Sequence, residues 1–270
     1  MGRRGITAVA ASALLAMTLL ASVQVPAVQA FSADTHYYLT YCLCRSCGFS
    51  AEQARIIASA DLSVDGGGTD TGFLYLLNNQ LWHGLSVPAL NDLREGCLWE
   101  RAVAMADPQS PAGSDAGLIA FGQFLHFQQD RHAHESYFLA PVWGHFYDGY
   151  MTDWLAFRPG SSRAMAEASL SYIAAFAAIY GLSNSTEVSL DLLIGGLISA
   201  NPSPSFWSTS SSGAASSVVE SYLGEFLPAP IAFTFSHQGE VVPPSRYPQI
   251  PLFSYLQLLY EQFLLWHALW

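Results

Sequence analysis

Ten residues, Leu125 to His134, constrain this chain more than any other stretch. Inside them, His126, Asp130 and His134 recur at intervals of four residues. On a helix that turns about 100° per residue, these three side chains fall within roughly 80° of one another. Imidazole and carboxylate groups on one helix face are ligands for a divalent cation, and the apolar residues between them make stray polar groups costly to bury. The spacing predicts a metal-binding helix, which we expect to begin at Asp115.

Further candidate ligands lie on both sides of this helix. After it, His145 and Asp153 are eight residues apart, which places them on the same face of a helix. Asp148, three residues after His145, is the competing carboxylate, and we prefer Asp153. The candidates that precede the helix are His36, His83 and either Asp61 or Asp65, two carboxylates near the end of an otherwise apolar helical segment.

The first 30 residues have the pattern of a removed export signal. Arg3 and Arg4 precede an apolar run from Ile6 to Leu20, and the sequence Val-Gln-Ala that ends at Ala30 is a small-residue cleavage site. The length of the run and the cleavage site favour a signal peptide over a transmembrane helix. We therefore expect a mature chain that starts at Phe31 and is released into the periplasm or secreted.

The balance of charge argues against binding to duplex nucleic acid. The chain has 21 acidic residues against ten basic ones, all of them arginine, and a formal net charge of −11. Removal of the first 30 residues takes away two arginines and no acid, which leaves eight basic residues and a net charge of −13. Such a chain is repelled by a long polyanion, although bound cations would reverse the sign of the field locally.

The expected state of the cysteines depends on whether the chain is exported. An even number of cysteines in an exported protein predicts one or two disulfides, with buried thiols as the alternative. A metal-thiolate cluster is disfavoured because a fourth ligand at metal spacing is missing. The residues concerned are Cys42, Cys44, Cys47 and Cys97.

The periodicity of the remaining sequence predicts an all-α fold. Helices are expected over residues 34–47, 51–64, 89–106, 161–180 and 184–200, the second opened by a capping box of Ser50 and Gln53. We expect one helical zinc-binding domain over residues 31–200. Residues 201–270 are expected to form a loop-rich extension packed on the same core. Within it, residues 201–217 form a loop, residues 226–242 favour β structure, and a helix over 252–270 packs on the core or lies on a membrane surface.

Four segments together resemble a known superfamily. The segments DTHYYLTY, IIASA with the following VD, LHFQQDRHAH and GH-x3-G-x3-D are similar to the zinc-dependent phospholipase C and P1/S1 nuclease superfamily, in particular to an uncharacterised bacterial branch. The resemblance implies a multi-helix bundle with up to three zinc ions. It implies Phe31 (main chain) and His36 at one ion, Asp61, His83, His126 and a bridging Asp130 at another, and His134, His145 and Asp153 at the third.

The activity that this resemblance implies is hydrolysis of a phosphodiester by a metal-activated water, with Asp61 and Asp130 as catalytic residues and Asp65 as the alternative to Asp61. A phospholipid at a membrane surface is the expected substrate. The alternatives are a P1-like nuclease or nucleotidase, whose aromatic residues would stack on bases, and a non-catalytic exported zinc-binding protein.

Overall fold

The computed structural model describes residues 33–65, 81–84, 88–106, 115–134, 155–183, 188–201, 212–233 and 235. All the regular elements in these ranges are helical, which confirms the expected all-α class. None of the described helices combines the length and the apolarity needed to span a bilayer. The elements are η1 (Asp34–Leu39, a π-helical turn), α2 (Thr40–Ser46), α3 (Ala51–Ser63), α5 (Pro88–Met105), α6 (Asp115–His134), α8 (Pro159–Ile179), α9 (Leu190–Ala200) and α10 (Ser212–Leu223).

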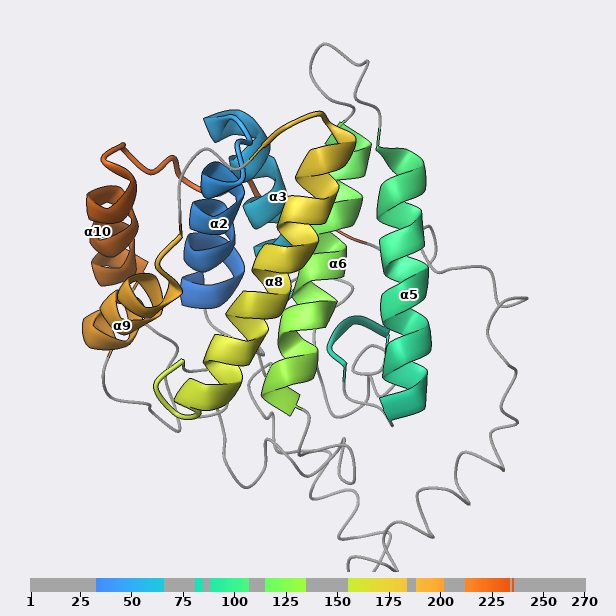
Figure 1. Cartoon of the computed structure of the whole chain (residues 1–270), viewed down its shortest axis with the longest axis horizontal. Helices are drawn as coiled ribbons and strands as arrows, with labels where there is room; N and C mark the ends of the chain where they lie inside the picture. The colour runs from blue at the N-terminus through green and yellow to red at the C-terminus, as the bar shows by residue number, and fades with distance from the viewer. Residues whose placement is uncertain are drawn as a thin grey trace, which may run out of the picture.

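Helix α6 is the element against which most others pack. It lies beside α8 and α5 in Figure 1, and α3 packs against it as well. Helices α9 and α10 pair with each other on the far side of α2 from α5 (Figure 1). The predicted metal-binding helix is therefore the central helix of the bundle, and its His126, Asp130 and His134 are buried.

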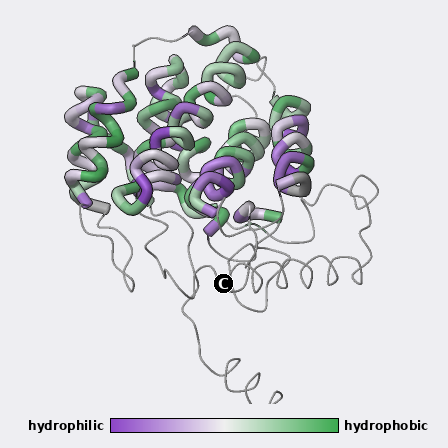
Figure 2. Tube along the Cα trace, turned by 60° about the horizontal axis from the view of Figure 1, so that its bottom comes forward, coloured by the Kyte–Doolittle hydropathy of each residue, from purple (hydrophilic) through white to green (hydrophobic). Residues whose placement is uncertain are grey.

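Aromatic rings fill the space between α5, α6 and α8. Phe121 of α6 stacks on Phe176 of α8, with ring centroids 4.0 Å apart and planes 13° apart. Trp99 of α5 contacts both rings, and Tyr172 of α8 meets Phe124 edge to face. Burial of each such ring stabilises the fold by roughly 1.5–3 kcal/mol. The described helices carry both polar and apolar positions (Figure 2), as expected of helices that bury one face.

The start of α3 follows the sequence prediction. The main-chain N–H of Gln53 donates to Ser50 Oγ over 3.2 Å, and the N–H of Ser50 donates to Gln53 Oε1 over 3.0 Å. This is the expected capping box, and it satisfies two N–H groups that the helix itself leaves without acceptors.

The segment after α10 runs along α3 without forming a strand. The N–H of Ile231 donates to Ser59 Oγ over 2.9 Å, and that of Phe233 donates to Ser63 Oγ over 3.2 Å. Its backbone is thus paired with helix side chains rather than with another strand. The β tendency expected for residues 226–242 is not realised in the described residues 226–233 and 235.

Two predicted boundaries in the second half of the chain are wrong. Helix α9 begins at Leu190 rather than at residue 184, because Ser189 has φ −84° and ψ 89°, outside the helical region. Helix α10 begins at Ser212, inside the segment expected to be a loop. Ala215 and Val219 of α10 are fully buried in the main core. Their tertiary packing outweighs the weak helix propensity of the surrounding serines.

The cysteines form no disulfide, so the first interpretation of their even number is wrong. Cys42, Cys44 and Cys47 are fully buried on and directly after α2, and Cys97 is partly buried on α5. Burial raises the pKa of Cys42 to about 12 and that of Cys47 to about 11. The three buried residues, Cys42, Cys44 and Cys47, are inert thiols that act as small apolar side chains, as in the alternative to a disulfide.

Candidate metal centre

Six ionisable side chains from four segments converge inside the bundle. Five of them have no exposed surface, and Asp65 is 4% exposed. Side chains of these types are almost never buried without partners or a cation. They are His36 of η1, Asp61 of α3, Asp65 just after α3, His83 of the segment 81–84, and His126 and Asp130 of α6.

A glycine brings α3 and α6 together at this point. A Cβ atom on Gly122 would lie 2.3 Å from the main-chain oxygen of Ile57 and 2.9 Å from the nitrogen of Asp61. Gly122 lies one helical turn before His126. Only a residue without a side chain permits this approach, which places the end of α3 opposite the histidine and carboxylate of α6.

A second glycine places His83. Gly84 has φ +62°, and a Cβ atom on it would lie 2.9 Å from Cα of Arg131 on α6. Asn91 of α5 donates from Nδ2 to the main-chain oxygen of Gly84 over 2.7 Å, which holds the segment from the other side. His83 is thereby fixed next to Asp130, although it belongs to no long helix.

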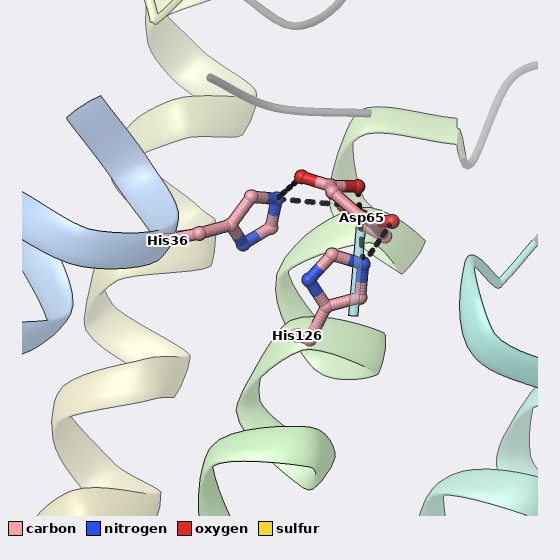
Figure 3. Close-up of side chains that lie close together, drawn as sticks. His36, Asp65 and His126 are labelled. Atoms are coloured by element: carbon pink, nitrogen blue, oxygen red, sulfur yellow. Dashed lines mark ion pairs between the residues drawn. The ribbon is translucent and has the colours of Figure 1, made fainter. Parts of the chain in front are cut away.

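Asp130 and Asp65 each divide their oxygens between two sets of imidazoles. Asp130 Oδ1 lies 3.2 Å from His36 Nε2, whereas its Oδ2 lies 2.8 Å from His83 Nδ1 and 3.0 Å from His126 Nε2. Asp65 repeats the pattern, with Oδ2 3.8 Å from His36 Nε2 and Oδ1 3.8 and 3.6 Å from the same nitrogens of His83 and His126. Figure 3 shows the imidazoles of His36 and His126 turned toward Asp65.

This donor set fits a metal ion. Single ligand atoms of His36, Asp65, His126 and Asp130 all lie within 4.8 Å of one another. Donors about 2.0–2.2 Å from one ion are at most about 4.4 Å apart, so a small inward movement of the side chains would bring all four to one ion. Asp65 Oδ1 and Asp130 Oδ1 are buried and accept no hydrogen bond from the described residues. Because an unpaired buried carboxylate oxygen is costly, these two oxygens are suited to a cation. The chain therefore has a buried His/Asp group that can hold a metal ion.

Protons stabilise the group when no metal is bound. Burial raises the pKa of Asp65 to about 6. Burial lowers the pKa of His126, but the negative charges of Asp130 and Asp65 and the hydrogen bond to Asp130 together outweigh this effect and raise the pKa to about 9. Burial raises the pKa of Asp130, but the charge of His126 and the hydrogen bonds from His126, His36 and His83 together hold this pKa well below its usual range. Metal binding must displace the protons from the imidazoles, so metal affinity rises with pH.

Asp61 lies on the opposite side of the imidazoles from Asp65. Its Oδ1 is 2.8 Å from His36 Nδ1 and 3.4 Å from His126 Nδ1, the ring nitrogens that face away from Asp130. Its Oδ2 accepts a hydrogen bond from the hydroxyl of Thr40 over 2.8 Å. Between the two carboxylates that the sequence left as alternatives, Asp65 faces the Nε2 atoms and Asp61 supports the rings from behind.

Two polar residues of this group were not singled out from the sequence. Gln129 and Thr40 are both fully buried, and Gln129 Nε2 donates to Thr40 Oγ1 over 2.8 Å. Gln129 could have been suspected, because it lies next to Asp130 in an apolar helix where a buried amide needs a partner. Thr40 carries no comparable signal in the sequence.

The predicted third ion remains a prediction. His134 is buried one turn beyond Asp130 on α6, with 1% of its surface exposed. The residues expected to join it, His145 and Asp153 with Asp148 as the alternative, lie outside the described residues, as does Phe31.

Comparison with known proteins identifies one match. A family model described as "Family of unknown function (DUF6765)" matches residues 31–81, a span that contains His36, Asp61 and Asp65. No curated protein and no solved structure matches the chain significantly.

Proposed function

We propose that this chain is an exported zinc-dependent phosphoesterase that hydrolyses a phosphodiester, in the manner of a phospholipase C. The observation that carries the proposal is the division of the Asp65 and Asp130 oxygens between His36 on one side and His83 with His126 on the other. A carboxylate that faces two sets of ligands is suited to bridge two closely spaced cations, and paired cations are common in phosphoester hydrolysis.

The donor types favour zinc among the divalent cations. Three imidazole nitrogens and two carboxylates face the centre, whereas calcium and magnesium prefer sites built from oxygen alone. The four segments that resemble the zinc-dependent phospholipase C and P1/S1 nuclease superfamily include His36, Asp65, His126 and Asp130, which supply all of these donors except the nitrogen of His83.

The residues of the chain have separate tasks in this proposal. His36, His83 and His126 would hold the ions, with Asp65 and Asp130 shared between them. Bound zinc would supply an activated water and a Lewis acid for the phosphoryl oxygens. Asp61 is a poor candidate for the general base, because both of its oxygens are already engaged by the imidazoles and by Thr40. The −13 charge of the mature chain is compatible with an anionic substrate, because the cations would supply the local positive field.

The test begins with the chain from residue 31 onward, prepared free of metal. Zinc content is measured by mass spectrometry after dialysis, and turnover is followed with p-nitrophenyl phosphorylcholine, phosphatidylcholine vesicles, bis-p-nitrophenyl phosphate and single-stranded DNA. We expect zinc to bind, and we expect zinc-dependent hydrolysis of the phosphorylcholine ester and of the vesicles.

The control variants separate the site from the rest of the chain. Asp130→Asn should abolish both zinc binding and turnover, whereas Asp191→Asn, on an exposed carboxylate of α9, should change neither. Hydrolysis of DNA alone would favour the nuclease alternative. A full zinc complement without turnover on any substrate would refute the enzyme and leave a zinc-binding protein.

A further inference from the structure

We propose that Asp61 is a positioning residue rather than a metal ligand. Together with Thr40 and Gln129, it would fix His36 as the tautomer that carries hydrogen on Nδ1, and its negative charge would favour the same tautomer of His126. This inference rests on the metal centre of the proposed function, but it does not depend on the reaction.

The hydrogen bonds around His36 form a closed ring. Thr40 Oγ1 donates to Asp61 Oδ2 over 2.8 Å, so its lone pairs are left to accept from Gln129 Nε2, also over 2.8 Å. The amide of Gln129 is thereby oriented with Oε1 toward His36 Nδ1, at 2.9 Å. Asp61 Oδ1 approaches the same nitrogen at 2.8 Å.

This ring determines which nitrogen of His36 carries the hydrogen. Both oxygens next to Nδ1, one of Gln129 and one of Asp61, can only accept, so Nδ1 must donate. In neutral His36 the lone pair is then on Nε2, which faces Asp130 and Asp65. The imidazole of His36 therefore directs its metal-binding lone pair toward the shared carboxylates, Asp130 and Asp65.

The same carboxylate oxygen also lies behind His126. His126 Nδ1 is 3.4 Å from Asp61 Oδ1, a charge contact without a hydrogen bond. The rings of His36 and His126 stack with centroids 4.2 Å apart and planes 28° apart. One carboxylate thus lies at the outer edge of two stacked imidazoles. Both of their Nε2 atoms point to the opposite side, where Asp130 lies.

His83 serves as the internal contrast. Its Nδ1, not its Nε2, faces Asp130 Oδ2 at 2.8 Å and His126 Nε2 at 3.1 Å. The inference therefore assigns opposite tautomers within one site, with hydrogen on Nδ1 in His36 and His126 and on Nε2 in His83. A carboxylate behind a metal-binding imidazole fixes its orientation and raises its basicity, and loss of such a partner weakens metal binding about 10- to 100-fold.

The test compares Asp61→Asn with Asp65→Asn in the full mature chain. Asparagine keeps the shape of aspartate and retains one acceptor oxygen for the imidazoles. Zinc affinity is measured by competition with a chromophoric chelator, and the tautomers are read from long-range ¹H–¹⁵N correlations of the histidine rings in the zinc-loaded protein. We expect Asp61→Asn to keep the zinc stoichiometry with a Kd about 10- to 100-fold weaker. We expect Asp65→Asn to lower the stoichiometry itself.

Several results would overturn the inference. Loss of a zinc equivalent in Asp61→Asn, as in Asp65→Asn, would make Asp61 a ligand. An unchanged Kd, hydrogen on Nε2 of His36 or His126, or failure of the protein to bind any zinc would contradict it as well. Zinc binding with the assigned tautomers but without turnover would contradict the proposed phosphoesterase activity and leave the role of Asp61 in place.

A second pair of variants keeps the inference testable if Asp61→Asn does not fold. Thr40→Val removes the hydroxyl that orients both Asp61 and Gln129, and Thr40→Ser restores it. Zinc affinity should fall in Thr40→Val and return in Thr40→Ser. Equal affinity in the two variants would remove Thr40 and the hydrogen-bonded ring from the assignment.

Discussion

Gly122 of α6 lies directly against the main chain of α3 at Ile57: a Cβ atom on the glycine would stand 2.3 Å from the Ile57 oxygen. Real Cβ atoms do not come this close, so the two helices can be this near only because position 122 has no side chain. The same contact holds Asp61 and Asp65 opposite His126 and Asp130. Helix spacing and metal binding should therefore change together.

The first prediction concerns this helix contact. Gly122→Ala should push α3 away from α6, lower the free energy of unfolding by roughly 1–3 kcal/mol and weaken zinc binding. The measurements are denaturant unfolding and zinc competition. The matched control is Gly96→Ala, at an exposed position of α5 where a Cβ atom meets nothing within 4 Å. That change should stabilise the helix by roughly 0.5–1 kcal/mol and leave zinc binding unaltered. Unchanged zinc affinity in Gly122→Ala would contradict the coupling.

The second prediction concerns the placement of His83. Gly84→Ala meets both a left-handed backbone conformation and a clash with Arg131, so it should displace His83 and reduce the zinc stoichiometry. Gly181→Ala is the control, because Gly181 has φ +68° but open space around it. It should cost about 1 kcal/mol of stability through backbone strain alone and retain all zinc. The two variants must differ in zinc content, measured by mass spectrometry, for the placement of His83 to hold.

The third prediction is that Asp65→Asn changes the stability of the protein in opposite directions without and with zinc. Its pKa is raised from 3.8 to about 6 in the folded chain because the carboxylate is buried. A raised carboxyl pKa means that ionisation costs stability as the pH rises from about 4 to about 6, and that this cost persists above that range. Asp65→Asn should therefore stabilise the metal-free protein at pH 7.5, by roughly 1–3 kcal/mol, and have little effect below pH 4. With zinc present, the same variant should be less stable than the parent, because it loses the stabilisation that bound metal provides. Thermal unfolding with zinc and with a chelator measures both signs, and destabilisation in both conditions would contradict the prediction.

The fourth prediction concerns an ion pair remote from the metal centre. Arg45 of α2 holds Glu225 with two hydrogen bonds of 2.6 and 2.8 Å, and Tyr41 donates to the same carboxylate over 3.1 Å. These hydrogen bonds, with the charge of Arg45, hold the pKa of Glu225 below its usual 4.5. The stabilisation is complete above pH 4.5 and is lost as the pH falls through the lowered value.

Both charged groups of this pair are partly exposed, so Glu225→Gln should cost only about 0.5–1 kcal/mol at pH 7, and less in high salt. Zinc affinity should not change. Denaturant unfolding at pH 7 and at pH 3 gives the comparison. Glu52→Gln is the control: its exposed carboxylate on α3 pairs with Arg55 over 3.4 Å, and its loss should cost no more than about 0.5 kcal/mol. An equal loss of stability at both pH values would show that the charge of Glu225 is not the cause.

The sequence by itself determined the helical class, the central helix with its histidine and carboxylate spacing, and the capping box at the start of α3. These features are local, because the positions of residues four or eight apart on a helix follow from its period alone. The sequence also supplied His36, His83 and both candidate carboxylates as residues of the right chemical type. It could not choose between Asp61 and Asp65, since α3 ends at Ser63 and helical periodicity no longer places Asp65.

Only the tertiary structure decided that Asp65 faces Asp130 and the imidazole Nε2 atoms while Asp61 stands behind the rings. It also decided that Thr40 and Gln129 join the group, that α10 forms within a serine-rich segment, and that three cysteines are buried as thiols. Each of these outcomes depends on contacts between residues distant in sequence, above all on how closely α3 approaches α6 at Gly122. A pattern within one helix fixes the direction of its own side chains, but the distance to the next helix is fixed by packing.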